Sequence, residues 1–275
     1  MTTPGGRLTL RLPDYVLQAW KELVPFRRSR RTFLPERPEE AVLTQLSEFV
    51  ARLPAGGRAR AVVLPTVDQD LFRGIIGSYG RVAGAPSALA MIGLHHPGMS
   101  EATGYIGEAA VLEATRLGLD TCWVGGYFRP EKAAGYLSLR PGERVWAVSP
   151  LGYAATSPTI SERVMKRAAR SNQRVPARKL TPGDDPESWP GWAQAGLMLA
   201  RLAPSAVNRQ PWRFHFENGD VVVEEEASCR DYGIPKRLDC GIAMLHFEVG
   251  ARCVGVQGEW EHLSGSRVAR FAVSS

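Results

Sequence analysis

Cysteine is scarce in this sequence, with four cysteines among 275 residues and no C-x-x-C pair. This number is too small for a disulfide scaffold at this length, and the spacing gives no zinc or dithiol motif. Long apolar runs are also missing, because the most apolar stretch, 82–94, is broken by Gly and Pro, whereas a membrane span needs about twenty apolar residues. The N-terminus has no apolar signal segment. We therefore expect a cytoplasmic protein with reduced thiols and no membrane partner.

Several catalytic motifs are absent as well. No G-x-G-x-x-G follows an expected strand, and neither G-x-x-x-x-G-K-[ST] nor G-x-S-x-G occurs, which argues against Rossmann, P-loop and α/β-hydrolase sites. No motif identifies a general acid, a general base or a nucleophile, so we name no catalytic side chain. His95 and His96 are adjacent rather than four residues apart, so we interpret them as loop or packed histidines and predict no metal. His246 lies in an apolar helical pattern and is interpreted as a packed histidine.

Acidic residues are absent from the stretch 163–179, which holds seven Lys and Arg residues, and four Arg residues lie within 27–31. The formal net charge of the chain is +6, so the remainder of the sequence is net acidic. Basicity is therefore local, which favours anion sites over a generally cationic surface. The stretch 163–179 leaves a nucleic-acid-binding protein as an alternative, although it contains no aromatic residue for base stacking.

Apolar periodicity predicts interspersed helices and strands. Helices are expected at 14–26, 39–53, 107–117, from Pro130, at 161–169, 192–202 and 238–252. Strands are expected at 61–64, 88–94, 121–124, 145–151 and 268–273, with a hairpin at 213–224 that turns at Asn218-Gly219. Three prolines in 181–190 predict a linker. This mixture of elements indicates an α/β or α+β protein.

A weak internal repeat runs through the chain. The sequence ARLPA at 51–55 precedes an expected strand in the first half, and ARLAP at 200–204 precedes one in the second half. Gly107 and Gly241, which are 134 residues apart, each lie at an apolar helix. Each half thus reads helix, turn, strand, helix, strand. Such duplication can place a binding site at the seam between two halves.

Three stretches combine residues that suit ligand binding. RRSRRTF at 27–33 offers guanidinium and hydroxyl groups that match phosphate, although a solvated basic turn at a helix end is the simpler alternative. CWVGGY at 122–127 places paired glycines after a strand, where backbone N–H groups can approach a ligand, although such a pair is most often only a turn. APSAVNRQPW at 203–212 is stiffened by two prolines and carries amide and hydroxyl groups suited to a planar heteroaromatic edge, although an ordinary helix-to-strand turn is the alternative.

Together these stretches resemble the FMN-dependent nitroreductase family. RRSRRTF is similar to its R-R-S-x-R-x-F motif, GLDTCWVGGYF resembles its strand and glycine turn beneath the flavin, and PLGY at 150–153 is similar to its following strand end. APSAVNRQPW is very similar to its P-S-x-x-N-x-Q-P-W loop. In the family that loop follows the Arg motif closely, whereas here it lies in the second half, which lacks an Arg motif. The chain therefore resembles the single-chain, two-half members.

The resemblance implies an α+β nitroreductase-like fold with a central, mostly antiparallel sheet flanked by helices, in which two halves form an internal pseudo-dimer. The halves would span 1–155 and 191–275, with a basic crossover and linker at 156–190. One FMN would lie at the seam. The residues implied on its phosphate side are Arg27, Arg28, Ser29 and Arg31, with Arg174 or Arg178 as a further basic contact. Those implied beside its ring are Gly125, Gly126, Pro204, Ser205 and Asn208, with Gln210 as a secondary candidate.

The resemblance also implies a reaction. NADH or NADPH would reduce the flavin, and the flavin would pass hydride to a small-molecule acceptor such as a nitroaromatic or a quinone. The family often has an acidic residue where Gly125 stands, so tuning of the flavin would differ here. The expected state is a monomer that contains the internal pseudo-dimer and has no nucleic-acid partner. An FMN-binding protein without reductase activity, for storage or scavenging, remains an alternative beside the nucleic-acid-binding protein.

Overall fold

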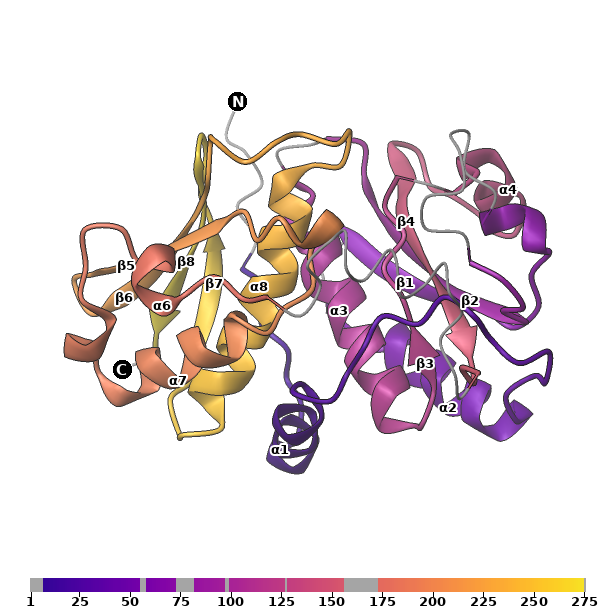
Figure 1. The fold of residues 1–275 in the computed structure, drawn as a ribbon, viewed down its shortest axis with the longest axis horizontal. Coiled ribbons are helices and arrows are strands. Elements are labelled where there is room, and N and C mark those ends of the chain that lie inside the picture. The colour runs from indigo at the N-terminus through magenta and orange to yellow at the C-terminus, as the bar shows by residue number, and fades with distance from the viewer. Residues whose placement is uncertain are drawn as a thin grey trace.

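The computed structural model describes residues 7–54, 58–72, 82–96, 99–126, 128–155 and 173–274. Two four-stranded antiparallel sheets lie toward opposite ends of the molecule, and two long helices, α3 (Glu101–Arg116) and α8 (Lys236–Arg252), lie between them (Figure 1). The fold is therefore α+β, as the sequence predicts, but the antiparallel sheet is present twice rather than once at the centre. No helix in the described ranges has the length and apolarity needed to cross a membrane.

The first sheet pairs its strands in the order β1 (Ala59–Leu64), β2 (Ser87–Leu94), β4 (Glu143–Gly152), β3 (Asp120–Thr121). One face of β2 packs toward α3, and its other face belongs to a smaller apolar cluster that includes residues of η1 (Gln69–Phe72) and α4 (Pro130–Gly135). A strand that is covered on both faces has a continuous apolar sequence. This explains why the run at 88–94 was recognisable as a strand.

The second sheet pairs its strands in the order β5 (Trp212–Glu217), β6 (Asp220–Glu225), β8 (Arg267–Val273), β7 (Gly258–His262). This is the order of the first sheet, strand for strand. The predicted hairpin is confirmed, and its turn residues Asn218 and Gly219 have φ values of 53° and 88°, as a two-residue hairpin turn requires. Strand β7 was not predicted from the sequence. It pairs with β8 and, at Trp260, with Leu8 near the N-terminus.

The remaining helices cover these two units. They are α1 (Asp14–Leu23), α2 (Glu40–Ala51), α6 (Ala177–Leu180) and α7 (Gly191–Ala200), with short 3-10 turns η3 (Pro186–Ser188) and η4 (Ala206–Asn208). Helix α2 packs on β1 and α3, α7 packs on α8, and α1 contacts both α3 and α8. The first and second halves therefore share the two central helices as a common core.

Helices α3 and α8 approach so closely that only glycine fits at two positions. A Cβ atom on Gly104 would lie 1.9 Å from the carbonyl oxygen of Leu238, and one on Gly241 would lie 1.9 Å from the carbonyl oxygen of Glu101. The contacts are reciprocal, because Gly104 and Gly241, like Glu101 and Leu238, are 137 residues apart. The two helices thus cross as a twofold-related pair.

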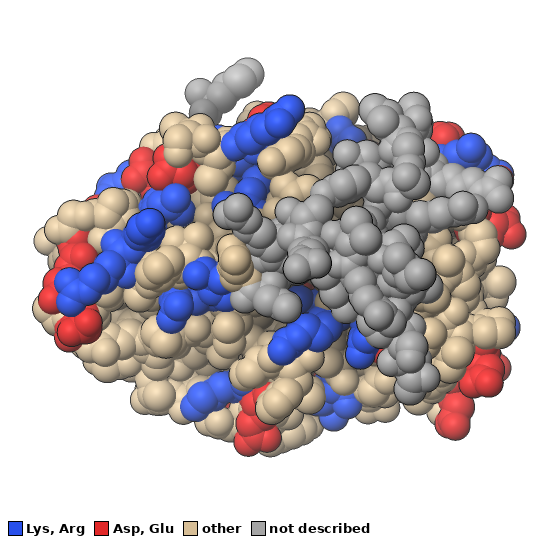
Figure 2. Space-filling view, viewed as in Figure 1, with Lys and Arg blue, Asp and Glu red and all other residues tan. Residues whose placement is uncertain are grey.

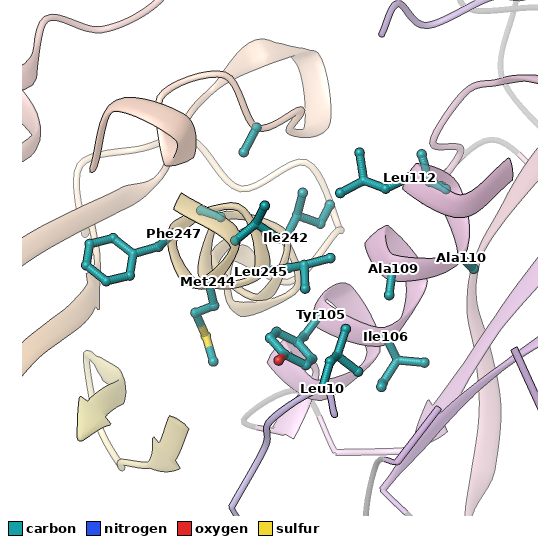
Figure 3. Packing of buried hydrophobic residues seen from close by; sticks show 14 of the residues in the cluster. Leu10, Tyr105, Ile106, Ala109, Ala110, Leu112, Ile242, Met244, Leu245 and Phe247 are labelled. Carbon is teal, nitrogen blue, oxygen red and sulfur yellow. The ribbon is translucent and has the colours of Figure 1, made fainter. Parts of the chain in front are cut away.

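Apolar side chains complete this seam. Tyr105 and Ala109 of α3 lie toward Ile242 and Leu245 of α8, whereas Phe247 points the other way, toward the second sheet (Figure 3). Helix α8 is therefore apolar on two sides, and one continuous apolar cluster contains residues from both sheets and from both central helices.

Some expectations from the sequence are corrected. The segment 181–190 is not a free linker, because Trp189 is buried against Phe216 and the Asp184 carboxylate accepts the backbone N–H of Phe216. The helix expected at 107–117 begins earlier, at Glu101, because α8 buries its first turns. Gly107 is not the counterpart of Gly241, since the reciprocal partner is Gly104. The helix expected at 161–169 lies outside the described residues, and the boundaries of the halves remain predictions.

Candidate functional site

A cleft lies where the two halves meet. The first half lines it with the Arg-rich segment and the chain after β3, and the second half with the loop before β5 and the beginning of α8. The lining residues are Ser29, Arg31, Cys122, Trp123, Val124, Gly125, Gly126, Pro204, Ser205, Ala206, Val207, Tyr232, Ile234, Leu238, Asp239 and Ile242. Its empty volume, including space open to solvent, is about 1020 Å³. Six residues predicted from separate motifs therefore line one cleft.

The Arg-rich segment, residues 27–33, follows α1, has an extended conformation and pairs with β3. The backbone N–H of Arg30 donates to the carbonyl of Thr121 at 2.9 Å, which makes a parallel bridge between Ser29 and Thr121. Side chains alternate along an extended chain. Ser29 and Arg31 accordingly line the cleft, while the Arg30 side chain lies 3.7 Å from the Asp120 carboxylate.

Two arginines of this segment, Arg27 and Arg28, lie near Arg174 of the basic stretch. Arg27 and Arg28 line a second, smaller cleft, and the Nη1 atom of Arg27 is buried without a hydrogen-bond partner in the described ranges. Arg174 donates from Nη1 to the Oδ1 atom of Asn208 at 2.7 Å and from Nη2 to the carbonyl of Leu202 at 3.1 Å. Burial, followed by the charges of Arg27 and Arg28, lowers the pKa of Arg174 to about 10. The guanidinium stays charged at pH 7, and a bound anion would relieve the repulsion.

The Gly125–Gly126 pair follows β3 and forms part of the cleft wall. A Cβ atom on either glycine would lie 3.3 Å from the side chain of Ile234. Ile234 belongs to the segment before α8, so a residue of the second half lies directly against the glycine backbone of the first half. The absence of side chains at the pair lets Ile234 approach the backbone this closely.

The loop between α7 and β5 is strained. Val207, Asn208 and Gln210 have φ values of 45°, 58° and 45°, in the left-handed region that is costly for non-glycine residues and most costly for β-branched valine. The Gln210 backbone N–H donates to the Ser205 hydroxyl at 2.9 Å. Because Ser205 and Val207 both line the cleft, this strain is held in the wall of the candidate site.

The side chains of Asn208 and Gln210 do not line the cleft. The Oε1 atom of Gln210 accepts the backbone N–H of Val175 at 3.0 Å, and its Nε2 atom donates to the carbonyl of Gln173 at 3.1 Å. The Nδ2 atom of Asn208 donates to the same carbonyl at 2.9 Å. The resemblance implied that these amides lie beside the flavin ring. In the structure, both amides instead hold the segment that carries Arg174.

The second basic candidate, Arg178, lies apart from this cluster. Its side chain is exposed and forms ion pairs with Asp185 and Glu187 at 3.4 and 3.0 Å. The earlier part of the basic stretch, 163–172, lies outside the described residues. Of the two arginines that the sequence could not separate, Arg174 is the one beside Arg27 and Arg28.

Sequence reasoning missed a buried ion pair in the cleft wall. Asp239 of α8 accepts from the Nε atom of Arg209 at 2.7 Å and from the backbone N–H of Ala206 at 3.1 Å. Arg209 also donates to the carbonyl of Ile234 at 2.8 Å. Burial raises the pKa of Asp239, and the Arg209 charge opposes that rise. The Asp239–Arg209 pair fixes the strained loop between α7 and β5 against α8. In the sequence, the signal for this pair was an acidic residue in the first turn of an apolar helix.

The apolar lining was also missed. Trp123, Tyr232, Ile234 and Ile242 line the cleft together, although they come from three separate parts of the chain. Each of them reads in the sequence as an ordinary core or loop residue. Their shared position follows from the packing of α8 against α3, which no short motif records.

Comparison with known proteins shows the family to which the chain belongs. The family model described as "Putative TM nitroreductase" matches residues 20–251. A Thermotoga maritima crystal structure described as a "putative nitroreductase" has a TM-score of 0.59 and 19% identity, with 100% of both chains covered. An FMN-dependent nitroreductase from Clostridium difficile has a TM-score of 0.40 and 18% identity, with 51% of this chain and 88% of that chain covered. No curated protein matches the chain. Since the family model spans most of the sequence, this protein belongs to that nitroreductase family.

Proposed function

We propose that this protein is an FMN-dependent oxidoreductase, in which NADH or NADPH supplies hydride for a flat, apolar acceptor such as a nitroaromatic or a quinone. Membership of the nitroreductase family supports an oxidoreductase. The observation that carries the proposal is the single cleft that joins Ser29 and Arg31, the Gly125–Gly126 pair and Pro204–Ser205 across the seam. These are the stretches that resemble the flavin site of the family.

The residues that are present fit FMN. The Nη1 atom of Arg27, which has no hydrogen-bond partner among the described residues, and the neighbouring charges of Arg28 and Arg174 suit a phosphate dianion. The apolar surfaces of Trp123 and Ile242 suit the flat ring system. A charged end and an apolar end therefore lie in adjoining parts of one seam.

When bound, the flavin supplies a ring nitrogen that accepts and returns hydride, so the protein binds and orients rather than performing acid–base chemistry. We propose that Arg27, Arg28 and Arg174 hold the phosphate, and that the Gly126 backbone lies beside the reactive edge. The Asp239–Arg209 pair fixes the loop that carries Pro204 and Ser205, which keeps the second half in place against the ring.

The acceptor class follows from the lining. Most of the lining residues are apolar, and the Asp239 carboxylate is already engaged by Arg209. A cleft with few free polar groups favours an acceptor that has little need of hydrogen bonds. Ile234, which lies against the glycine pair, adds to the apolar lining.

We also propose one flavin per chain. Under the 137-residue offset that relates α3 to α8, Leu238 corresponds to Glu101, and Gly125 corresponds to His262. In that place the buried carboxylate of Glu101 lies 2.7 Å from Nδ1 of His262 and 3.4 Å from Nε of Arg237. A buried ionic cluster thus occupies the position where a second cleft would lie, which supports a monomer with one site.

The test is a visible spectrum of the protein after incubation with FMN and desalting, followed by anaerobic addition of NADH or NADPH. We expect one retained flavin per 30.1 kDa chain and loss of its visible absorption. A flavin that is retained but not reduced would favour a flavin-binding protein without reductase activity. No retained flavin, together with salt-dependent retention on DNA, would favour the nucleic-acid-binding alternative.

A further inference from the structure

A buried series of hydrogen bonds begins at the wall of the cleft and ends inside the seam. Trp123 lines the cleft, and its indole Nε1–H donates to the Oε2 atom of Glu108 at 2.6 Å. The Oε1 atom of Glu108 lies 2.8 Å from Nε2 of His246 on α8. The side chains of Glu108 and His246 are fully buried. One aromatic wall of the cleft is therefore tied to both central helices.

The indole ring is also fixed by shape. A Cβ atom on Gly107 would lie 2.5 Å from Cη2 of Trp123, so the ring lies directly against the backbone of α3. The next residue along that helix is Glu108, which accepts the indole N–H. Close packing therefore sets the plane of the ring, and the hydrogen bond sets its rotation within that plane.

Packing alone would not need an ionisable pair at this position. With its Oε2 atom taken by the indole, Glu108 has its Oε1 atom within hydrogen-bond distance of Nε2 of His246. Nδ1 of His246 then has no hydrogen-bond partner in the described ranges. Burying such groups is costly, and apolar side chains of similar volume would cost less. His246 lies four residues after the cleft-lining Ile242 on the same helix, so the pair lies one helical turn from the cleft lining.

We propose that Glu108 and His246 are positioning residues for Trp123, and that they hold its indole as a flat wall against the ring of the bound flavin. The proposal rests on the proposed function for the identity of the ligand. Its structural part, the holding of the indole by the carboxylate, does not depend on any ligand.

The same helix offers a matched control. Glu113 of α3 is also buried, and its carboxylate accepts the indole N–H of Trp20 at 3.2 Å and pairs with Arg116. Trp20 is fully buried in the core and does not line the cleft. Glu108→Gln and Glu113→Gln therefore remove the same kind of buried carboxylate from the same helix, but only the first change reaches the cleft.

The experiment measures two quantities in the full chain. The first is the indole ¹H–¹⁵N resonance of Trp123 in ligand-free protein, assigned by its loss in Trp123→Phe, and the second is the dissociation constant for FMN. We expect Glu108→Gln to shift the resonance and to raise the dissociation constant about tenfold. Glu113→Gln should shift the Trp20 resonance and change the constant less than about twofold. His246→Gln, which keeps a donor near Nε2, should stay close to the wild type, whereas His246→Leu should resemble Glu108→Gln.

The outcomes separate this proposal from the proposed function. If Glu108→Gln moves the Trp123 resonance but binds FMN as well as Glu113→Gln does, the positioning role is wrong and FMN remains the cofactor. If the Trp123 resonance does not move, Glu108 does not hold the ring and the proposal is overturned. A wild-type chain that does not bind FMN overturns the proposed function instead. Should Glu108→Gln fail to fold, equal FMN affinity in His246→Gln and His246→Leu would overturn the positioning role.

Discussion

Arg174 is the residue at which both halves meet at the proposed phosphate site. Its guanidinium is held by Asn208 from the second half, and it feels the charges of Arg27 and Arg28 from the first half. Neither half alone assembles this group of cations. Three positive charges would stabilise a phosphate bound among Arg27, Arg28 and Arg174. Displacement of any one of these side chains would weaken its binding.

The first residue-scale prediction tests this shared arrangement. Arg28→Ala and Asn208→Ala should each weaken FMN binding, although the two positions are 180 residues apart. Arg28→Ala removes a charge, and Asn208→Ala releases Arg174 from its 2.7 Å hydrogen bond. We expect a loss of about tenfold in each case, since a charge-assisted hydrogen bond is worth about 1.5–3 kcal/mol. Fluorescence titration with FMN measures it.

The control for that prediction is Arg178→Ala, because Arg178 is exposed and paired with Asp185 and Glu187 instead. Its affinity for FMN should equal that of the wild type. An equal loss of affinity in Arg178→Ala would mean that general positive charge, and not the arrangement around Arg174, binds the cofactor.

We expect the buried carboxyl group of Glu248 to make the free energy of unfolding depend on pH. The carboxylate accepts the hydroxyl proton of Tyr105 and lies 3.5 Å from the Nη1 atom of Arg252, yet burial outweighs these contacts and raises its pKa from 4.5 to about 7. Between these values the folded chain binds a proton that the unfolded chain has lost. The free energy of unfolding therefore falls as pH rises from about 4.5 to 7, by about 3 kcal/mol from this group.

Glu248→Gln should remove that dependence, because glutamine cannot ionise and keeps an oxygen to accept from Tyr105. Urea denaturation at pH 5 and at pH 7.5 measures the free energy of unfolding of both proteins. We expect the variant to gain stability relative to the wild type at the higher pH. A difference that is the same at both pH values would mean that Glu248 does not titrate in this range.

Residue identity predicted only part of the site. The arginines and glycines could be found because phosphate and close backbone approach each require particular residue types. Asp239, Trp123 and Ile234 could not, because their roles depend on where α8 lies. The orientation of Asn208 was also beyond the sequence, since a left-handed loop turned its amide toward Gln173 and Arg174.

Among the elements, the loop between α7 and β5 has a strained backbone that lowers the stability of the fold. Val207→Gly should relieve the strain at φ 45° and raise the free energy of unfolding by about 1 kcal/mol, because glycine adopts this region without a Cβ clash. Ala206→Gly, at a neighbouring position without positive φ, should lower it by about 0.5–1 kcal/mol. Chemical denaturation of the two variants gives the comparison, and a loss of stability in both would contradict the strain.

The crossing of α3 and α8 gives a second element-scale prediction. Gly241→Ala places a methyl group where the backbone oxygen of Glu101 lies, so the helices must separate, and we expect a loss of about 3 kcal/mol. Gly104→Ala should cost a similar amount because its contact with Leu238 is reciprocal. Gly135→Ala at the end of α4 meets no atom within 4 Å and should change stability by less than about 1 kcal/mol. Equal effects at all three positions would contradict the close crossing.

Elements were predictable where local chemistry decides them. The hairpin at Asn218-Gly219 follows from its turn residues, and β2 follows from an apolar run that is covered on both faces. Strand β7 was missed because only Gly258 and Trp260 are buried in a segment that otherwise reads as polar. Its pairing with β8 and with Leu8 comes from distant parts of the chain, which periodicity cannot show.

At the scale of the molecule, the net charge is positive. Figure 2 shows Lys and Arg across the middle of one face, with Asp and Glu mostly near its edges. The formal net charge of the chain is +6, and Arg27, Arg28 and Arg174 at the proposed anion site contribute to it. Such a field would attract phosphate-bearing donors and cofactors, and salt would weaken that attraction.

The two sheets do not make two independent folding units. The apolar cluster runs from the first sheet through α3 and α8 into the second, and residues near Leu8 pair with the last sheet. A half without its partner would expose the face of α3 or α8 that now fills the seam. We therefore predict one cooperative unfolding transition, with coincident curves from circular dichroism and tryptophan fluorescence and equal calorimetric and van't Hoff enthalpies. Gly241→Ala should move that single transition to lower temperature without dividing it, whereas two separate transitions would mean that each sheet has a core of its own.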